Sequence, residues 1–294
     1  MHSPAKINIG LRVLERRASD GFHAIESIFV PISFGDEMII EHSLDFSLTT
    51  ENLLREPSRS AFEAVTERGK ISDNLVWRCM QKLKAHSHEG LKVHLKKRIP
   101  AGAGLGGGSS NAGTLLRYFH HHYRQLLDDR DAFEIAADLG SDVPFFLHRK
   151  PRLVTGRGEI LADIDVGPGW GVLCLPHVVV PTKEAYADLK RPLQPAPVSE
   201  TVSELTLEIR QALSGSNWKG IRKLENDFES VVFPKFPVLA EVKEFFYNKE
   251  ALYSSMTGSG SAIFALVETE SRAEALKQES QFAFPAFQFE SFSF

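Results

Sequence analysis

A glycine-rich segment between residues 100 and 112, PAGAGLGGGSSNA, has the residue types and spacing that most clearly predict chemistry in this chain. Glycine has no Cβ atom, so backbone N–H groups in such a segment can approach an oxyanion closely. A helical pattern begins at Ser109 or Ser110, and the positive end of that helix would point toward the same anion. Because the segment lies between a predicted strand and a predicted helix, a phosphate-binding loop is favoured over a flexible linker.

Well-known phosphate-binding patterns do not account for this loop. Gly102, Gly104 and Gly107 match G-x-G-x-x-G, but Pro100-Ala101 separates them from the preceding strand. An acidic residue that ends a second strand about twenty residues later, which binds ribose in dinucleotide folds, is also missing. The signature G-x-x-x-x-G-K-[ST] and the catalytic loops of protein kinases do not occur in the sequence. The loop therefore belongs to another type of phosphate-binding fold.

Asp142 is a candidate general base. It follows a helical segment that ends at Gly140 and precedes Val143-Pro144, which indicates a stiff turn. A carboxylate in such a turn could accept a hydroxyl proton during phosphoryl transfer. The same position suits capping of the next helix by Ser141 or Asp142, and the spacing leaves both interpretations open.

The N-terminal residues 5–14 alternate as a strand, with Ile7 and Ile9 on one face and Lys6 and Asn8 on the other. A single lysine on a strand is usually a solvated surface charge. The position of Lys6 beside Asn8, opposite the apolar face, is also compatible with a binding cleft.

The elements that must position these residues follow from periodicity and from turn and cap signals. In the first half we expect a hairpin turn at Asp20-Gly21, a break at Gly35-Asp36 and a helix cap at Asp73-Asn74. The expected elements are, in order, strands at 5–14, 22–30, 38–42 and 44–48, a helix at 75–83, a strand at 91–95, and helices at 112–127 and 131–140. Gly140 is expected to end the last of these helices. Residues 50–72 receive no role.

A basic turn, HRKPR at residues 148–152, separates the two halves of the chain. We therefore predict an N-terminal ATP-binding lobe at 1–150 and a C-terminal substrate lobe at 151–294. Expected elements of the second half are strands at 171–180 and 262–267, helices at 183–189, 202–213 and 238–246, and a core strand in the phenylalanine-rich C-terminus. The basic stub Lys96–Arg98 beside the glycine loop is expected to be a solvated strand end.

Composition limits the class of protein. The chain has 294 residues, 43% of them hydrophobic, and a formal net charge of −4, which argues against a nucleic-acid-binding protein. Cys79 and Cys174 are the two cysteines and lack metal-ligand spacing, so we expect a reducing compartment. Without a membrane-length apolar run or a leader peptide, a cytoplasmic protein that contacts no membrane is expected. A monomer or weak homodimer is also expected.

Several segments together carry a family resemblance. GAGLGGGSSNA resembles the second motif of the galactokinase, homoserine kinase, mevalonate kinase and phosphomevalonate kinase (GHMP) superfamily; SPAKINIGL resembles its first motif and MTGSGSAIF its third. The ordered set SPAKIN, DGFH, DNLV, GLGGGSSNA, GSDVPFF and GRGEIL is most similar to the branch that phosphorylates 4-diphosphocytidyl-2-C-methyl-D-erythritol. Mevalonate and homoserine kinases, which lack DGFH with GSDVPFF, are the alternative enzymes. A non-catalytic nucleotide-binding relative is the alternative of another class.

The resemblance implies an α+β, two-lobed GHMP-kinase fold, with an N-terminal lobe resembling ribosomal protein S5 domain 2 and a C-terminal α/β sandwich lobe. It implies transfer of the ATP γ-phosphate to the 2-hydroxyl of the substrate in the non-mevalonate route to isoprenoid precursors, with ATP as co-substrate and Mg²⁺. Lys6 and Asp142 would be catalytic. The residues that would bind ATP are Asn74 and the loop Pro100, Ala101, Gly102, Ala103, Gly104, Leu105, Gly106, Gly107, Gly108, Ser109, Ser110 and Asn111. The ligands of the metal ion are unknown.

The same resemblance implies the residues that bind the cytidine-linked substrate. Asn8 is a substrate contact of the first motif, and Phe22 and His23 match an aromatic-histidine pair in which tyrosine is the more usual aromatic residue. Tyr186 is the expected second aromatic wall, with Thr182 nearby. The alternative for Phe22 is an ordinary position in the hairpin core.

Overall fold

The computed structural model describes residues 1–18, 20–54, 71–87, 89–194 and 221–294. The contacts within the chain divide it into two compact units. The first unit consists of Met1–Ala5, Gly35–Ala101 and Gly106–Arg149, and the second of Lys6–Phe34, Gly102–Leu105 and Lys150–Phe294. The glycine loop therefore contributes residues to both units. That one unit serves ATP and the other the second substrate stays a prediction.

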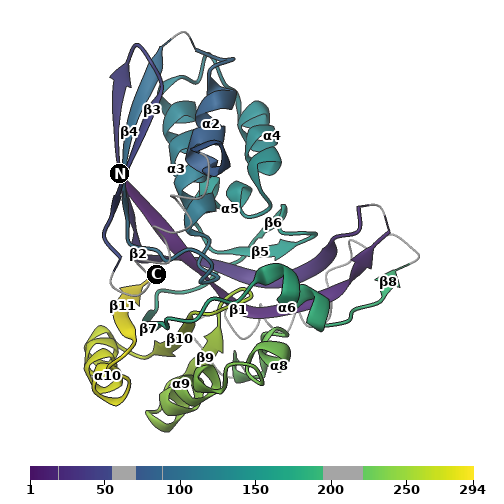
Figure 1. The fold of residues 1–294 in the computed structure, drawn as a ribbon, viewed down its shortest axis with the longest axis vertical. Coiled ribbons are helices and arrows are strands. Elements are labelled where there is room, and N and C mark those ends of the chain that lie inside the picture. Colours follow the sequence, from purple (N-terminus) through teal and green to yellow (C-terminus); the bar gives the residue numbers. More distant parts are fainter. Residues whose placement is uncertain (19, 55–70, 88, 195–220) are drawn as a thin grey trace. The chain divides into compact units, whose positions relative to one another are not determined.

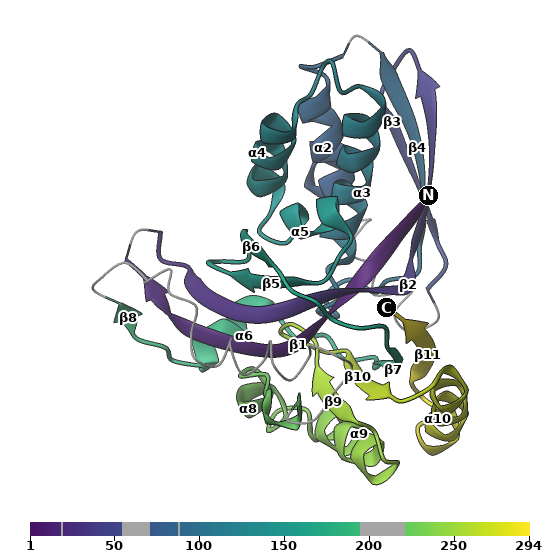
Figure 2. The same cartoon turned by 180° about the vertical axis from the view of Figure 1, so that it is seen from behind.

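Two long strands supply residues to both units. They are β1 (His2–Arg17) and β2 (His23–Ser43), which appear in purple in Figures 1 and 2. The expected break at Gly35-Asp36 is wrong, because β2 continues through it. A Cβ atom at Gly35 would collide with the backbone carbonyl oxygen of Ser3, so glycine permits close packing here rather than a turn.

The first unit has helices packed on one face of a sheet (Figure 1). Strand β4 (Gly90–Lys97) pairs in parallel with β3 (Ser47–Asn52) and antiparallel with Glu37–Ser43 of β2. The helical elements are η1 (Ile71–Asp73), α2 (Leu75–Leu83), α3 (Gly107–His122), α4 (Asp129–Leu139) and α5 (Val143–His148). Apolar side chains of β4, α2, α3 and α4 form one continuous core. This core fixes the position at which the glycine loop enters α3.

Helix α3 begins earlier than expected. Gly106 caps it in the left-handed conformation with φ of 69°, and the backbone N–H of Ser110 already donates to the carbonyl oxygen of Gly106 over 2.8 Å. Gly107 and Gly108 therefore form the first turn instead of preceding it. The sequence pattern marks the first helical residue that carries a side chain. The helix itself begins two residues earlier, at glycines that have no side chain.

The second unit contains the rest of the large sheet and a separate sheet (Figure 2). Strands β5 (Arg152–Thr155) and β6 (Ile160–Asp163) form a hairpin beside β2, and β8 (Leu193–Gln194) pairs with the end of β1. The other sheet has the order β11 (Gln288–Ser293), β7 (Trp170–Leu175), β10 (Ile263–Val267) and β9 (Tyr253–Met256). Its helical elements are α6 (Thr182–Asp188), η2 (Ile221–Lys223), α8 (Glu229–Val232), α9 (Pro237–Asn248) and α10 (Glu270–Ala283).

Several expected elements of the second half are confirmed. The strands near 171 and 262, the helices near 183 and 238, and the C-terminal core strand correspond to β7, β10, α6, α9 and β11. Helix α10 was not expected. The predicted helix at 202–213 and most of the segment 50–72 lie outside the described residues. In the described part of the chain, no helix has both the length and the apolar character to span a bilayer.

Candidate active site

Parts of the three motifs meet around the ammonium group of Lys6 in the second unit. Lys6 is 3% exposed, so the expectation of a solvated charge does not hold. Its Nζ donates to the Asn8 side-chain oxygen over 2.5 Å and to the Gly104 carbonyl oxygen over 2.7 Å. It also lies 4.9 Å from the centre of the Phe29 ring. One cation thus connects the first strand to the glycine loop.

Asn8 joins the first motif to the third. Its Oδ1 atom also accepts from the Thr257 hydroxyl over 3.0 Å and from the Gly258 N–H over 2.8 Å. Its amide nitrogen donates to Ser27 Oγ over 3.0 Å. The Asn8 side chain is therefore held by protein groups on both sides, and its predicted contact with substrate stays a prediction.

Gly104 fits this junction because it has no side chain. Its φ is 75°, and a Cβ atom would collide with the backbone carbonyl oxygen of Thr257. The neighbouring Ala103 carbonyl accepts from the Ala262 N–H over 3.2 Å, and the Leu105 carbonyl accepts from the Lys6 N–H over 3.0 Å. The loop segment 102–105 is thus clamped between β1 and the third motif.

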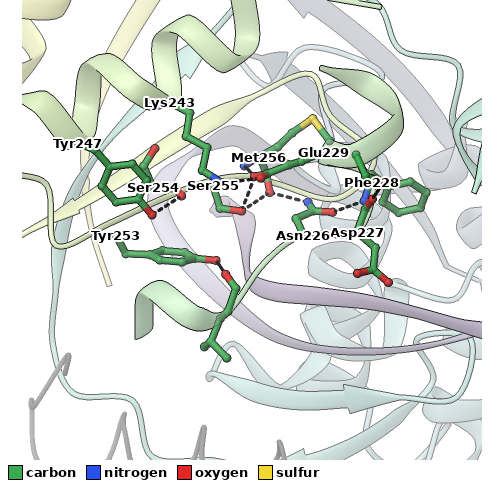
Figure 3. A network of polar contacts seen from close by, with 12 residues as sticks. Asn226, Asp227, Phe228, Glu229, Lys243, Tyr247, Tyr253, Ser254, Ser255 and Met256 are labelled. Atoms are coloured by element: carbon green, nitrogen blue, oxygen red, sulfur yellow. Dashed lines mark hydrogen bonds and ion pairs between the residues drawn. The ribbon is translucent and has the colours of Figure 1, made fainter. Parts of the chain in front are cut away.

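A network behind the third motif holds its turn in place (Figure 3). The Asn226 amide donates to the carbonyl oxygens of Met256 over 2.7 Å and Gly258 over 2.8 Å. Glu229 Oε1 accepts from the Met256 N–H over 2.8 Å, and its other oxygen binds Lys243 Nζ at 2.5 Å. The sequence alone predicts no role for Asn226 or Glu229. Their signal, an Asn-Asp-Phe-Glu run before a short helix, is no different from an ordinary loop.

The helical part of the glycine loop belongs to the first unit. Gly106–Ser109 forms the start of α3, where unpaired backbone N–H groups and the helix dipole favour an anion. Ser109 is half-buried, whereas the Ser110 hydroxyl is buried and lies 2.8 Å from the Ser3 hydroxyl. The Ser110 side chain therefore anchors the helix start to the first strand, and its predicted ATP contact is untested.

A buried ion pair supports this helix start. Asp36, which is fully buried, pairs with Lys97, and the expectation that Lys97 is a solvated strand end is wrong. Asp36 Oδ1 accepts from the backbone N–H groups of Arg98 over 2.6 Å and Ile99 over 2.8 Å. The pair therefore fixes the chain just before the glycine loop.

Asn111 belongs to the same buried group. Its oxygen accepts from Lys97 Nζ over 3.0 Å, and its nitrogen donates to Asp36 Oδ2 and Ser3 Oγ, each over 2.9 Å. The oxygen and the nitrogen of the Asn111 side chain thus both bind protein groups. The ATP contact predicted for Asn111 stays a prediction. Sequence alone could not find Asp36, because its partner is 61 residues away.

Asp142 occupies the position before α5 without capping it. It is half-buried, and its side chain makes no cap hydrogen bond, so the capping interpretation is wrong for this residue. Its carboxylate is therefore not used as a helix cap. Lys6 and Asp142 belong to different units, and the pairing of their charges stays a prediction.

Asn74 confirms the expected helix cap. Its Oδ1 accepts from the Val76 N–H over 2.9 Å at the start of α2. Its side-chain nitrogen has no role in that cap. The predicted contact of Asn74 with ATP is a separate matter that stays a prediction.

The residues predicted to bind the nucleobase include an aromatic pair. The His23 and Tyr186 rings stack with centres 5.2 Å apart and planes 22° apart, and Tyr186 packs edge-on against Phe228. His23 Nδ1 lies 3.1 Å from the Leu14 carbonyl oxygen. Because a carbonyl only accepts, Nδ1 carries a proton, and Nε2 is the acceptor of the neutral ring.

Phe22 lies at the turn before β2 and is 56% exposed, so the hairpin-core alternative is wrong. The Arg157 guanidinium lies 5.4 Å from the centre of its ring. Thr182, at the start of α6, has its hydroxyl 2.8 Å from that of Ser259. Thr182 thus contacts the third motif directly, which places a predicted substrate residue at a motif of the superfamily.

Known proteins show the family to which these features belong. Residues 74–150 match the model "GHMP kinases N terminal domain", and residues 207–286 match "GHMP kinases C terminal". The chain is 39% identical over 299 aligned residues to a 4-diphosphocytidyl-2-C-methyl-D-erythritol kinase of Leptospira interrogans, covering 100% of both chains. It is 38% identical to the kinase of the same name from Leptospira biflexa, covering 99% of this chain and 97% of the other.

Solved structures agree with the sequence relatives. A crystal structure of 4-(cytidine 5'-diphospho)-2C-methyl-D-erythritol kinase matches with a TM-score of 0.77 and 30% identity, covering 100% of this chain and 98% of the other. A homoserine kinase from Cytophaga hutchinsonii matches with a TM-score of 0.63 at 17% identity, covering 99% and 93%, which shows a shared fold. The expected α+β, two-lobed fold class is confirmed. The chain belongs to the 4-diphosphocytidyl-2-C-methyl-D-erythritol kinase family of the GHMP superfamily.

Proposed function

We propose that this protein is an ATP-dependent kinase that transfers the γ-phosphate to the 2-hydroxyl of 4-diphosphocytidyl-2-C-methyl-D-erythritol, a step toward isoprenoid precursors. The observation that carries the proposal is the junction at Lys6, where the first motif, the glycine loop and the third motif share hydrogen bonds through Asn8 and Gly104. The names of the full-length relatives support the same substrate. Mevalonate and homoserine kinases have the same fold at much lower identity.

The glycine loop would hold the ATP phosphates through its backbone N–H groups, with the start of α3 adding its dipole. Asp142 would accept the proton of the substrate 2-hydroxyl group while the oxygen of that hydroxyl group forms a bond to the γ-phosphorus. The bond between that phosphorus and the β–γ bridging oxygen breaks, and ADP leaves. The Lys6 ammonium would stabilise negative charge that develops on the reacting oxygens.

The base of the cytidine substrate would be recognised by His23, Phe22 and Tyr186. The exposed Phe22 ring can stack on the base. Stacking needs only the aromatic ring, so phenylalanine can replace the tyrosine that is more usual at this position. The acceptor at His23 Nε2, fixed by the hydrogen bond of Nδ1 to Leu14, suits the exocyclic amino group of cytosine. Uracil has a carbonyl oxygen there, so this contact would discriminate against it.

Mg²⁺ would enter with ATP. Among the described residues, no three His, Cys, Asp or Glu side chains lie together as a metal site. Mg²⁺ commonly keeps several waters and binds phosphate oxygens, so the nucleotide itself can supply most ligands. Ser109, in the first turn of α3, has a hydroxyl group that would add one. When bound, the ion offsets the charge of the transferring phosphoryl group.

One assay tests the proposed function. Purified protein, ATP and Mg²⁺ are incubated with the cytidine-linked alcohol, its uridine-linked analogue, mevalonate or homoserine, and the products are followed by phosphorus NMR. We expect a new phosphate-ester signal with the cytidine compound and little with the others. Faster turnover of mevalonate or homoserine would identify another kinase of the superfamily, and no turnover of any acceptor would support a non-catalytic relative. The cytoplasmic location and the monomeric or weakly dimeric state stay predictions.

A further inference from the structure

Two arginines of the first unit lie at the junction of α3 and α5. The helices pack closely there, because a Cβ atom at Gly113 would come within 2.7 Å of Phe146 Cβ and 3.2 Å of the Val143 carbonyl oxygen. Arg117 follows Gly113 by one helical turn on α3. Arg149 follows Phe146 by three residues, at the end of α5, where it adopts a left-handed conformation with φ of 50°. Arg149 belongs to the basic turn that the proposed function leaves unexplained.

Within the described residues, neither guanidinium has a protein acceptor for its buried donors. Arg117 Nε and Arg149 Nε and Nη2 are shut off from solvent without a hydrogen-bond partner among the described residues. The Thr114 hydroxyl, one turn before Arg117 on α3, is also buried and has no hydrogen-bond partner in the described part of the chain. Buried donors without acceptors cost stability, so a cluster of them calls for an explanation.

The two side chains also act on each other. Burial and the nearby Arg117 lower the pKa of Arg149 to about 10, and burial lowers the pKa of Arg117. No carboxylate of the residues that the structure describes contributes to either shift. Both groups stay cationic near pH 7, because the pKa of Arg149 is about 10 and an arginine guanidinium keeps its proton in proteins. Two like charges are therefore held together without a counter-ion from the described part of the chain.

We propose that Arg117 and Arg149 form a second anion site, which binds the phosphate group of a small molecule. Guanidinium groups match phosphate oxygens in paired hydrogen bonds. The buried, unpartnered atoms do not include either Nη of Arg117 or Nη1 of Arg149, so these edges are available to a ligand. Arg117 lies ten residues beyond Gly107, about 15 Å along α3 from the helix start that faces the ATP phosphates. The site is thus distinct from the glycine loop.

Anion binding to the whole protein tests this site. The glycine loop is first filled with a non-hydrolysable ATP analogue and Mg²⁺, and inorganic phosphate or inorganic diphosphate is then titrated by calorimetry at constant ionic strength. We expect at least one anion to bind, and Arg117→Gln and Arg149→Gln to weaken it about tenfold or more, as for a lost charged hydrogen bond. Arg124→Gln changes an exposed arginine of the same unit and should leave binding unchanged.

The two anions distinguish the sources of the ligand. Tighter binding of diphosphate indicates a phosphoanhydride, and equal binding indicates a single phosphate group. Unchanged affinity in both glutamine variants, or no binding of either anion at millimolar concentration, would overturn the site. If Arg149→Gln does not fold, Arg149→Lys provides the test in its place. It keeps the charge but loses the planar guanidinium group, so it should also weaken anion binding.

Melting temperatures separate this site from a structural role. Without anion, Arg117→Gln and Arg149→Gln should melt no lower than the unchanged protein, because each removes unpartnered buried donors. Added phosphate should raise the melting temperature of the unchanged protein more than that of either variant. A lower melting temperature in both variants with no anion response would show that the arginines only support the fold. These readouts do not depend on turnover, so failure of the proposed kinase function leaves them interpretable.

Discussion

Lys6 and Asp142, the two predicted catalytic residues, differ in how the protein holds their side chains. The Lys6 ammonium group donates hydrogen bonds to Asn8 and Gly104, so protein groups fix its position before any ligand binds. Asp142 makes no cap bond, although it precedes a helix. A short polar side chain in that position usually caps, and its failure to do so supports a different role.

Replacing Asp142 by Asn should lower turnover by about 10² to 10⁴-fold, the usual contribution of a general base. The amide cannot accept the hydroxyl proton, yet it keeps the size of the carboxylate. ATP affinity and the melting temperature should change little. Steady-state kinetics with calorimetric ATP titration measure both effects, and Asp129→Asn, which alters a 92% exposed carboxylate, is the control. Near-normal turnover in Asp142→Asn would remove Asp142 as the base.

Replacing Phe22 by Ala should raise the KM for the cytidine substrate about 5- to 150-fold, because base stacking on an aromatic ring contributes about 1–3 kcal/mol. The KM for ATP should stay nearly constant. Phe22→Tyr should retain the low KM, and Phe282→Ala removes a 91% exposed ring as a control. Equal changes in both KM values would contradict a role in base recognition.

At the scale of elements, strand β2 and helix α3 show what sequence can predict. Alternation and caps located most strands and helices, because those signals are local. The pair Gly35-Asp36 predicts a break because its local pattern resembles a turn, and Ser3, the close neighbour that requires the glycine, is distant in sequence. The buried Lys97–Asp36 pair was missed for the same reason. Motif spacing predicts the roles of the glycine loop and, together with the family resemblance, of Asp142, and these roles stay predictions. Asn226, which holds the third motif, offers no local signal.

Replacing Asp36 by Asn should destabilise the first unit by about 3–5 kcal/mol, because the buried Lys97 charge loses its partner. The melting temperature should fall by roughly 6–20 °C. ATP affinity should weaken as well, since Asp36 holds the chain before the glycine loop. Thermal unfolding and nucleotide titration measure these effects.

Two variants make the Asp36 result interpretable. Glu41→Gln breaks an exposed pair with Lys92 and should change stability by less than about 1 kcal/mol. Adding Lys97→Met to an apolar replacement of Asp36 should recover part of the loss, because no unpaired charge remains. If Asp36→Asn melts like the unchanged protein, the pair is not a support of the loop.

On the scale of the whole molecule, each unit contains one buried thiol. Burial raises the pKa of Cys79 from about 9 to about 12 and raises that of Cys174 well above its ordinary value. A folded-state pKa above the unfolded value means that the unfolded chain loses protons first as the pH rises. The free energy of unfolding therefore falls as the pH rises above about 9, and the loss stops growing once the pH exceeds the folded-state pKa of the thiol.

At pH 8 we expect iodoacetamide to modify neither thiol in the folded protein, because both are fully buried and protonated. Both should react once urea unfolds the chain. Mass spectrometry of the two cysteine peptides across a urea series would report the opening of each unit separately. Rapid modification of folded protein would contradict the burial of that thiol.

The path of the chain has a practical consequence for anyone who wishes to dissect it. Residues 6–34 associate with residues 150–294, as in the backbone bonds that Leu11 makes to Glu225 and Asp227. A fragment that ends at Arg149 would lack the residues that residues 6–34 contact, and it would expose unpaired strand edges. Separately expressed halves should therefore aggregate, and co-expression of the two pieces is the way to recover a working assembly.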